Sequence, residues 1–483
     1  MDNKIALVGM MGSGKSEVGK RLANILGFTQ VDLDEEFEKK YGSISNFFEN
    51  KGEREFREKE KKLLEEFCKH ENVVISTGGG IIEKAENREI LKRMRTFYLE
   101  NSPEELWERV KDSSRPLIKK GRAYFMSLHE KRKKLYDLFE RIDVNKLLPY
   151  EVAAKLTNAI VADKMIEKMN TFQKVRIFHG PLPSNDGVVV SAKNVDRIWK
   201  TSGIVVDDGE NLKSVGRMEK LWEIFLNSGI SRSSRIRAVG GGTLTDAVGF
   251  ASLTFMRGIP FELVPTTLLG MVDASIGGKF AINFKGTKNL VGAFGKPDVL
   301  VNPMFSLSLS DERFKEGIVE SLKIGVVYDK RLFEYIEDNV KKILKKNLES
   351  VDEMVKLAVK DKLEVVRRDP FDKNFRHILN FGHTVAHAIE SASQNTISHG
   401  HAVAIGMIME SQKFSPLISE RVKNIVEMLN FKEIEIPNFE KWFIMDKKRE
   451  GSQIIIPIVK EIGKSHLKRV DINTVLDTFR NYP

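Results

Sequence analysis

Short apolar runs alternate with longer stretches whose apolar residues recur at helical spacing over most of the chain. In the first third, apolar runs of strand length lie at Ile5–Val8, Val73–Ser76 and Thr96–Leu99. A second series consists of Val175–Phe178, Val188–Ser191, Ile204–Val206, Ile236–Val239, Phe261–Val264 and Val299–Val301. Because strands that alternate with helices form parallel sheets covered by helices, the pattern predicts an α/β protein.

The pattern changes at two places, which predict the domain boundaries. The charged stretch from about Tyr150 to Met169 contains neither proline nor glycine and is predicted to be a helix, with the main boundary near residues 160–172. From about Glu312, long helical patterns dominate until a strand-like run at Gln453–Val459. We therefore expect three parts: residues 1–160 and 172–311, both α/β, and residues 312–483, mainly helical.

Composition narrows the class of protein. The 483 residues are too many for one ordinary core, and 41% hydrophobic with 30% charged residues is typical of a soluble globular protein. The net charge of +10 could indicate nucleic acid or small anionic ligands. Because basic and acidic residues are interleaved, we expect phosphate- and carboxylate-bearing small molecules, no nucleic acid and no membrane. A single cysteine, Cys68, and an N-terminus without a signal-peptide pattern favour the cytoplasm.

The segment from Gly9 to Ser16 fits the pattern G-x-x-x-x-G-K-[ST]. It follows a predicted strand and opens a helical pattern, which is the context that this phosphate-binding motif requires. Backbone N–H groups of the glycine-rich loop would surround phosphate oxygens, Lys15 would reach the β- and γ-phosphates, and the Ser16 hydroxyl would bind Mg²⁺. The motif therefore predicts ATP and Mg²⁺, held by Gly12, Ser13, Gly14, Lys15 and Ser16.

Further motifs follow in the first part of the chain. They are Asp32 and Asp34 in VDLD, the GE-x-x-FR-x-x-E pattern of residues 52–60, the triplet Gly78–Gly80, the segment Arg115–Leu117, and Arg132 with Tyr136. Together they resemble shikimate kinase over residues 1 to about 158. The resemblance implies that shikimate is held by Asp34, Arg57, Gly79, Gly80 and Arg132. It also implies that Asp34 orients the attacking hydroxyl, that Arg115 closes on ATP, and that Asp32 positions Mg²⁺ through water. Lys134 departs from the family, which usually has a proline there.

Histidines gather late in the chain, four of the nine lying between residues 383 and 401. Two histidines and one glutamate can hold zinc with one position open for a substrate. Arg376, Asn380, His383 and His387 are spaced so that they would form one polar stripe on a single helix. Such a stripe, flanked by apolar residues, favours a site over a solvated face.

The remaining motifs of the second part also carry polar residues next to glycines. They are Gly240–Gly242 with Asp246, PTTLLGMVDASIGGK (residues 265–279), KNLVGAF (288–294), EGIVESLKIG (316–325), RHILNFGHTVAHAIE (376–390) and SHGHAV (398–403). A glycine triplet at the end of a strand lets a pyrophosphate approach the backbone. In their order and spacing these motifs resemble 3-dehydroquinate synthase, over about residues 172 to 483.

The resemblance implies zinc on Glu320, His383 and His399. It implies NAD held by Glu210, Lys213, Gly241, Gly242, Asp246, Thr266 and Thr267. The substrate would meet Asp273, Lys279, Lys323, Lys362 and His387, which are expected to be catalytic, together with Asn289, Arg376 and Asn380. Its phosphate would also meet Arg257 and one lysine of the pair Lys447/Lys448. We expect this lysine to be Lys447. The family converts 3-deoxy-arabino-heptulosonate 7-phosphate to 3-dehydroquinate and phosphate, and its NAD is regenerated within the reaction.

Two residues depart from that family. His401 stands where a glutamate is common after the last zinc ligand, so a carboxylate behind the metal site is missing or His401 competes as a ligand. Ala192 stands where an aspartate is expected, which leaves one dinucleotide contact in doubt. The expected function is a bifunctional, homodimeric enzyme that phosphorylates shikimate and makes 3-dehydroquinate, with dimerisation through the C-terminal part. The alternative is a P-loop kinase or sensor fused to a metal- and NAD-dependent polyol dehydrogenase.

Overall fold

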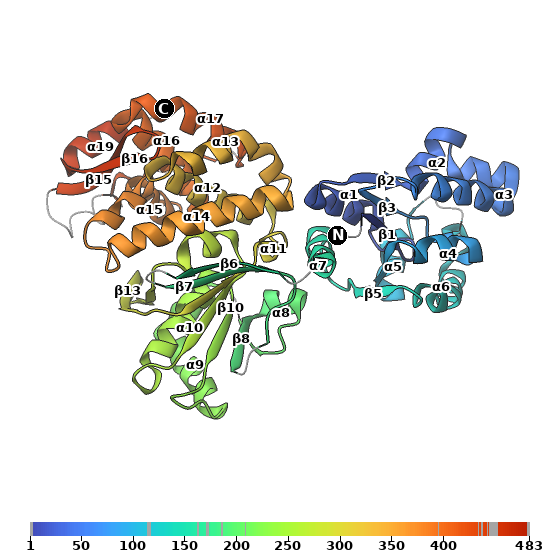
Figure 1. Cartoon of the computed structure of the whole chain (residues 1–483), viewed down its shortest axis with the longest axis horizontal. Coiled ribbons are helices and arrows are strands. Elements are labelled where there is room, and N and C mark those ends of the chain that lie inside the picture. The colour runs from blue at the N-terminus through green and yellow to red at the C-terminus, as the bar shows by residue number, and fades with distance from the viewer. Residues whose placement is uncertain are drawn as a thin grey trace. The chain divides into compact units, whose positions relative to one another are not determined.

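The apolar runs form the strands of two large, mostly parallel sheets, one in each of two units (Figure 1). In this computed structural model the first unit comprises Met1–Ala162 and the second Asp163–Pro483. The structure describes residues 3–113, 117–161, 164–170, 173–184, 187–207, 209–394, 396–432, 434–435, 438–441, 443 and 453–480. Each unit is described by itself.

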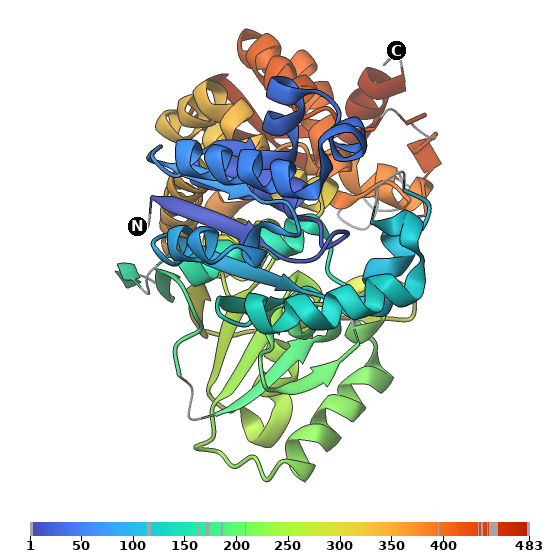
Figure 2. The same ribbon diagram turned by 90° about the vertical axis from the view of Figure 1, so that its right-hand side faces the viewer.

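The first unit is built on a five-stranded parallel sheet in the order β2-β3-β1-β4-β5. The strands are β1 (Lys4–Val8), β2 (Thr29–Asp32), β3 (Val73–Ser76), β4 (Arg95–Glu100) and β5 (Glu140–Asp143). Helices flank the sheet (Figures 1 and 2), namely α1 (Lys15–Leu26), α2 (Leu33–Tyr41), α3 (Ile44–Phe67), α4 (Ala85–Lys92), α5 (Pro103–Val110), α6 (Arg122–Tyr136) and α7 (Pro149–Ile160). The three predicted strands are confirmed. The edge strand β5 buries only Ile142, so it has no apolar pattern to detect.

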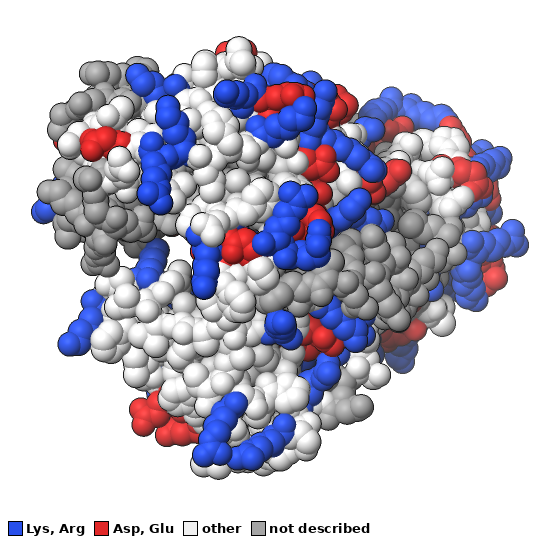
Figure 3. Space-filling model, turned by 60° about the vertical axis from the view of Figure 1, so that its left-hand side comes forward, with Lys and Arg blue, Asp and Glu red and all other residues white. Residues whose placement is uncertain are grey.

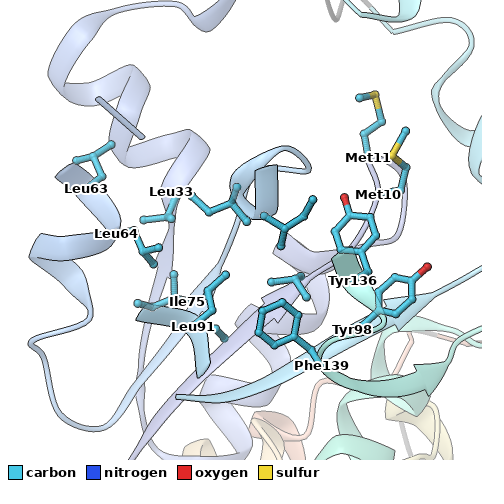
Figure 4. Close-up of a cluster of buried hydrophobic side chains, with 14 of the residues drawn as sticks. Met10, Met11, Leu33, Leu63, Leu64, Ile75, Leu91, Tyr98, Tyr136 and Phe139 are labelled. Atoms are coloured by element: carbon cyan, nitrogen blue, oxygen red, sulfur yellow. The ribbon is translucent and has the colours of Figure 1, made fainter. Parts of the chain in front are cut away.

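Side chains from the sheet and the helices form one hydrophobic cluster in this unit (Figure 4). Tyr98 of β4 stacks on Tyr136 of α6 with ring centroids 4.8 Å apart. Met10 and Met11, from the loop after β1, belong to the same cluster. The core therefore anchors the loop that contains the phosphate-binding motif.

The second unit contains a seven-stranded sheet in the order β6-β7-β14-β11-β10-β8-β9. The strands are β6 (Lys164–Asn170), β7 (Lys174–His179), β8 (Val188–Ala192), β9 (Ile204–Val206), β10 (Ile236–Gly240), β11 (Phe261–Pro265) and β14 (Asp298–Val301). Only the edge strand β6 is antiparallel to its neighbour. From β8 the chain first adds β9 on one side. It then adds β10 on the other side of β8, followed by β11, so the strand order reverses between β8 and β10. The crevice between the carboxyl ends of β8 and β10 is where such sheets bind ligands.

The helix predicted from Tyr150 to Met169 is wrong in its second half. The helix α7 ends at Ile160, and Lys164–Asn170 forms β6, which pairs with β7. Lysine, glutamate and methionine are compatible with a helix, so local propensity could not detect the strand. Pairing with the edge of β7 is a tertiary interaction, and such interactions often override propensity.

The rest of the second unit surrounds this sheet. Next to it lie α8 (Lys193–Trp199), α9 (Val215–Asn227), α10 (Gly242–Thr254) and the hairpin β12 (Lys279–Phe284)–β13 (Thr287–Phe294). The mainly helical part, above the sheet in Figure 1, contains α11 (Pro303–Ser306), α12 (Asp311–Val327), α13 (Lys330–Leu344), α14 (Leu348–Arg368), α15 (His383–Ala392), α16 (His399–Phe414), α17 (Pro416–Met428), β15 (Gln453–Glu461), β16 (Lys464–Asp471) and α19 (Ile472–Arg480). The predicted change to long helices is confirmed.

The surface is mixed in charge. On the face shown in Figure 3, lysine and arginine side chains are interspersed with aspartate and glutamate. Among the described residues, no helix combines the length and the apolar character needed to cross a membrane.

Candidate active sites

The loop between β1 and α1 needs glycine at three positions. Gly9, Gly12 and Gly14 have φ angles of 151°, 86° and 84°. The Nζ atom of Lys15 donates to the carbonyl oxygens of Gly9 at 2.9 Å and Met10 at 3.0 Å, so its ammonium group folds over the loop. Amide groups at a helix N-terminus with a lysine beside them fit the phosphates of a nucleotide. The residues predicted to bind ATP and Mg²⁺, Gly12, Ser13, Gly14, Lys15 and Ser16, lie in this loop and the first turn of α1.

Two aspartates lie beside the loop, at the carboxyl end of β2. Asp32 caps α2, because its carboxylate accepts from the N–H groups of Asp34 at 3.0 Å and Glu35 at 3.3 Å. A Cβ atom at Gly78 would lie 2.9 Å from Oδ1 of Asp34 and 2.5 Å from Oε1 of Glu60. The Asp34 carboxylate therefore lies against the glycine triplet that follows β3.

Two buried arginines lie beside the same triplet. Arg57 of α3 is 8% exposed and Arg132 of α6 is 1% exposed. A Cβ atom at Gly80 would overlap the guanidinium of Arg57, and one at Gly79 would lie 3.6 Å from Nη1 of Arg132. Without side chains, the triplet can lie directly against both guanidinium groups.

Each arginine forms ion pairs with glutamate side chains. Arg57 pairs with Glu60 at 2.8 Å and Glu53 at 3.3 Å, and Arg132 pairs with Glu83 at 3.0 Å. Burial raises the pKa of Glu60, although the charge of Arg57 opposes this shift. Two oriented guanidinium groups near Asp34 suit the binding of a small hydroxylated carboxylate. The structure brings together Asp34, Arg57, Gly79, Gly80 and Arg132. Arg115 lies outside the described residues.

In the second unit, three predicted ligands come together from three helices. Glu320 lies in the middle of α12 and is completely buried, while His383 and His399 are the first residues of α15 and α16. Oε1 of Glu320 lies 3.7 Å from Nε2 of His383 and 3.3 Å from Nε2 of His399. One ligand atom from each residue falls within 4.8 Å of the others. This geometry suits a tetrahedral cation with one open position.

The surroundings fix both imidazoles so that Nε2 faces the carboxylate. Nδ1 of His383 lies 3.3 Å from the carbonyl oxygen of Phe381, and Nδ1 of His399 lies 3.3 Å from Oε2 of Glu390. Burial would raise the pKa of Glu320, but Lys323 and the two histidines hold it well below its usual value. Within the described part of the chain, Oε1 of Glu320 has no hydrogen-bond partner. An ionised, buried carboxylate with this orphaned oxygen fits a bound metal ion.

A second group of predicted residues lies at the carboxyl end of β10. The N–H of Thr266 donates to the carbonyl oxygen of Gly240 at 2.9 Å, and a Cβ at Gly241 would lie 3.1 Å from the Thr267 side chain. A side chain at Gly241 would therefore crowd Thr267. Because glycine has none, the backbone between the end of β10 and the N-terminus of α10 is bare, and a pyrophosphate could approach it.

Charged residues complete that crevice. Lys213 donates to Asp246 at 2.8 Å and contacts Asn289, and Glu210 accepts from Nδ2 of Asn283 at 2.8 Å. Burial raises the pKa of Asp246 to about 6. The seven residues predicted for NAD are thus adjacent, and they are Glu210, Lys213, Gly241, Gly242, Asp246, Thr266 and Thr267. Their acidic groups and bare backbone fit a dinucleotide.

Three buried cations lie close to one another, near Glu320 and Asp273. Lys323, Lys362 and Arg376 are 2%, 4% and 5% exposed. Lys323 pairs with Glu320 and Lys362 with Asp273. Burial would raise the pKa of Asp273, but the two lysines lower it to about 2; burial lowers that of Lys362 to about 8. Such a cluster fits an anionic substrate.

The other predicted substrate residues are placed as follows. Lys279 is exposed and pairs with Asp372, and His387 is exposed with its ring 5.6 Å from that of His383. Asn380 is exposed at the end of a 3₁₀ helix, and Lys447 lies outside the described residues. Arg257 follows the C-terminus of α10, at the far end of that helix from Gly242. The structure therefore does not bring Arg257 to the site of its own chain.

Known families match both units. A family model for shikimate kinase matches residues 11–161. Models for the N-terminal and C-terminal parts of 3-dehydroquinate synthase match residues 203–316 and 317–448. A bifunctional shikimate kinase/3-dehydroquinate synthase of Thermotoga maritima is 38% identical over 97% of this chain and 98% of its own length. The chain belongs to this family of bifunctional enzymes.

Other similar proteins cover only part of this chain. A 3-dehydroquinate synthase of Clostridium tetani is 31% identical over 70% of this chain and 95% of its own length. The structure of a 2-epi-5-epi-valiolone synthase from Streptomyces hygroscopicus, which has NAD⁺ and Zn²⁺ bound, is 22% identical and covers 66% of this chain and 98% of its own. Its TM-score of 0.58 shows that the two share a fold.

Two expectations about the synthase unit are corrected. Arg376, Asn380, His383 and His387 do not share one helix, because the 3₁₀ helix Phe375–Asn380 ends before Gly382, whose φ of 79° starts α15. His401 does not leave His399 without a carboxylate, and its ring is engaged elsewhere. Glu390 supplies the carboxylate, and the His401 ring stacks on Phe431 with centroids 4.6 Å apart.

Three glutamates that support these sites were given no role from the sequence. Glu60 holds Arg57 in the kinase unit, and Glu390 holds His399 in the synthase unit. Glu410 is fully buried and accepts from the N–H groups of Gly382 at 2.9 Å and Thr384 at 3.1 Å, on either side of His383. Glu390 follows His383 by seven residues, which places both on one face of α15 but does not identify His399 as its partner.

Proposed function

We propose that this chain transfers the γ-phosphoryl group of ATP to shikimate in its first unit. We propose further that its second unit converts 3-deoxy-arabino-heptulosonate 7-phosphate to 3-dehydroquinate and phosphate, with NAD and zinc. The proposal rests on the family and on one observation: residues from distant parts of the chain lie together in each unit, Asp34 with Arg57 and Arg132 in the first, and Glu320 with His383 and His399 in the second.

In the kinase unit, Arg57 and Arg132 would bind the shikimate carboxylate and Asp34 would orient the attacking hydroxyl. Lys15 and the N–H groups of the phosphate loop would neutralise the transferred phosphoryl group, and Ser16 would bind Mg²⁺. The support is geometric, because the glycine triplet lies between both guanidinium groups and the Asp34 carboxylate. Arg115 would close on ATP, as its place in the family's motif suggests.

In the synthase unit, Glu320, His383 and His399 would hold zinc, which when bound polarises a substrate hydroxyl for hydride transfer to NAD⁺. Lys323 would keep Glu320 ionised. Residues that meet the carboxylate, hydroxyls and phosphate of the substrate would be Asp273, Lys279, Asn289, Lys362, Arg376, Asn380, His387 and Lys447. Buried cations are effective here because their attraction for an anion is weakly screened.

A net polyol dehydrogenase is the competing function for the second unit, and one assay separates the two. The purified chain is mixed with 3-deoxy-arabino-heptulosonate 7-phosphate and NAD⁺, and phosphate and NADH are both followed. We expect phosphate release without accumulation of NADH, because the hydride returns to the same substrate. Accumulation of one NADH per substrate molecule would support the dehydrogenase instead.

We also propose a homodimer formed through the synthase unit. The helix α10 has 13 residues and is therefore about 20 Å long, which separates Arg257 from the crevice of its own chain. A contact between Arg257 and substrate would thus need a second copy. Exposed apolar side chains on the β12–β13 hairpin, Phe284, Leu290, Val291 and Phe294, offer surface for such a contact.

That the enzyme works in the cytoplasm stays a proposal from its single cysteine.

Sedimentation equilibrium is expected to give twice the mass of one chain. Arg257→Ala should raise the KM for the phosphate-bearing substrate about 10- to 150-fold, since one charged contact is worth roughly 1.5–3 kcal/mol. Shikimate phosphorylation by the same sample is the control. A monomeric protein that is fully active would contradict the dimer.

A further inference from the structure

The side chain of Gln173 forms two hydrogen bonds with a loop that is distant along the chain. It lies between β6 and β7 and is only 2% exposed. Its side-chain Nε2 donates to the carbonyl oxygen of Ser275 at 3.2 Å, and its Oε1 accepts from the N–H of Gly277 at 3.0 Å. One primary amide thus satisfies a backbone acceptor and a backbone donor in a loop more than 100 residues away along the chain.

That loop lies inside the synthase substrate site. It joins Asp273, which pairs with Lys362, to Lys279 at the start of β12. The carbonyl oxygen of Gly277 also accepts from Nη1 of Arg376 at 3.0 Å. The position of the loop therefore sets where this guanidinium lies.

Local hydrogen bonds hold the start of the loop, where the N–H of Ile276 donates to the carbonyl oxygen of Asp273 at 3.0 Å, but its glycines are intrinsically free. Gly277 and Gly278 have φ angles of 115° and 66°, conformations that glycine adopts freely and loses most entropy to fix. A Cβ atom at Gly277 would overlap the guanidinium of Arg376, so glycine is required there. A loop with two consecutive permissive residues needs contacts from outside to select one conformation.

We propose that Gln173 is a positioning residue of the synthase site, which fixes the Ser275–Gly278 loop and through it Arg376. This inference rests on the proposed synthase function. Only an amide offers a donor and an acceptor of this length together, because a carboxylate would face the Ser275 carbonyl with no proton to donate. Gln173 lies ten residues after the start of the second unit, so the first residues of this unit help to shape its substrate site.

The test uses the full chain with Gln173→Met, which keeps the length of the side chain and removes both hydrogen bonds. We expect kcat/KM for 3-deoxy-arabino-heptulosonate 7-phosphate to fall about 10- to 100-fold, in the range that a displacement near 1 Å causes. The Kd for NAD⁺ and the kinase activity of the same sample should stay near wild type, whereas the midpoint of thermal unfolding should fall by a few degrees because two buried backbone groups lose their partners. Gln412→Met, at an exposed position of α16, is the matched control.

A second variant, Gln173→Glu, adds a signature that a merely structural role would not produce. When protonated, its carboxyl group again presents one donor and one acceptor, so its activity relative to wild type should rise as the pH falls. When ionised, the group cannot donate to Ser275.

The outcomes separate the claims. If wild type and Gln173→Met have the same kcat/KM, or if the variant loses NAD⁺ affinity in parallel with activity, the positioning role is overturned. If the wild-type chain itself releases no phosphate from the substrate, the proposed synthase function fails and this inference fails with it.

Discussion

Replacing Lys15 by methionine is expected to lower shikimate phosphorylation by at least about 10²- to 10³-fold, the usual effect of removing one positioned electrostatic donor. The Lys15 ammonium group lies on the carbonyl oxygens of Gly9 and Met10, in the loop where the nucleotide phosphates would bind. Methionine fills a similar volume, so the loss would reflect charge. The measurement is ADP formation that depends on shikimate.

The same sample provides the control for that prediction. Dehydroquinate formation should be unchanged, because Lys15 lies in a unit that contains none of the predicted synthase residues. Lys20→Met, at an exposed position of the same helix, should leave both activities intact. Parallel loss of both activities in a folded Lys15→Met protein would contradict two separate sites.

Replacing His383 by alanine is expected to remove bound zinc and to lower dehydroquinate formation by at least about 10³-fold. A metal ion contributes several kcal/mol of charge stabilisation, and each 1.36 kcal/mol is a factor of ten. The site offers three protein ligands, so the loss of one leaves only Glu320 and His399. Zinc content per chain and phosphate release are measured on the same preparation.

His401→Ala is the matched control for that ligand. His401 lies two residues after His399, but its ring stacks on Phe431. We therefore expect its zinc content to match wild type. Stoichiometric zinc in His383→Ala, or loss of zinc in His401→Ala alone, would show that the ligand set is wrong. Kinase activity should persist in both variants.

Much of the architecture could be predicted because buried parallel strands have continuous apolar sequences. Runs such as Ile5–Val8 and Val299–Val301 are hidden on both faces of a sheet, where apolar side chains fit best. Strands at the sheet edges have no such requirement. Glu140–Asp143 and Lys164–Asn170 were missed for this reason, since backbone pairing with a neighbour determines them.

The sites were predictable where one short segment contains the chemistry, as in the phosphate loop. They were less predictable where a helix break or a distant partner decides the geometry. The positive φ of Gly382 breaks the helix that was predicted to contain Arg376, Asn380, His383 and His387. Arg376 and His383 therefore lie on two separate helices of the same unit. The contact of Glu390 with His399 depends on how two helices pack, which spacing in the sequence does not specify.

Separating the two units is the most direct test that each contains its own complete site. Residues 1–162 and 163–483 are expressed separately, and shikimate phosphorylation and dehydroquinate formation are measured on each piece. We expect each piece to retain its reaction within about tenfold, or about 1.4 kcal/mol in activation free energy, and to lack the other reaction. A piece that is folded and binds its ligands, yet is inactive until the other piece is added, would contradict the account.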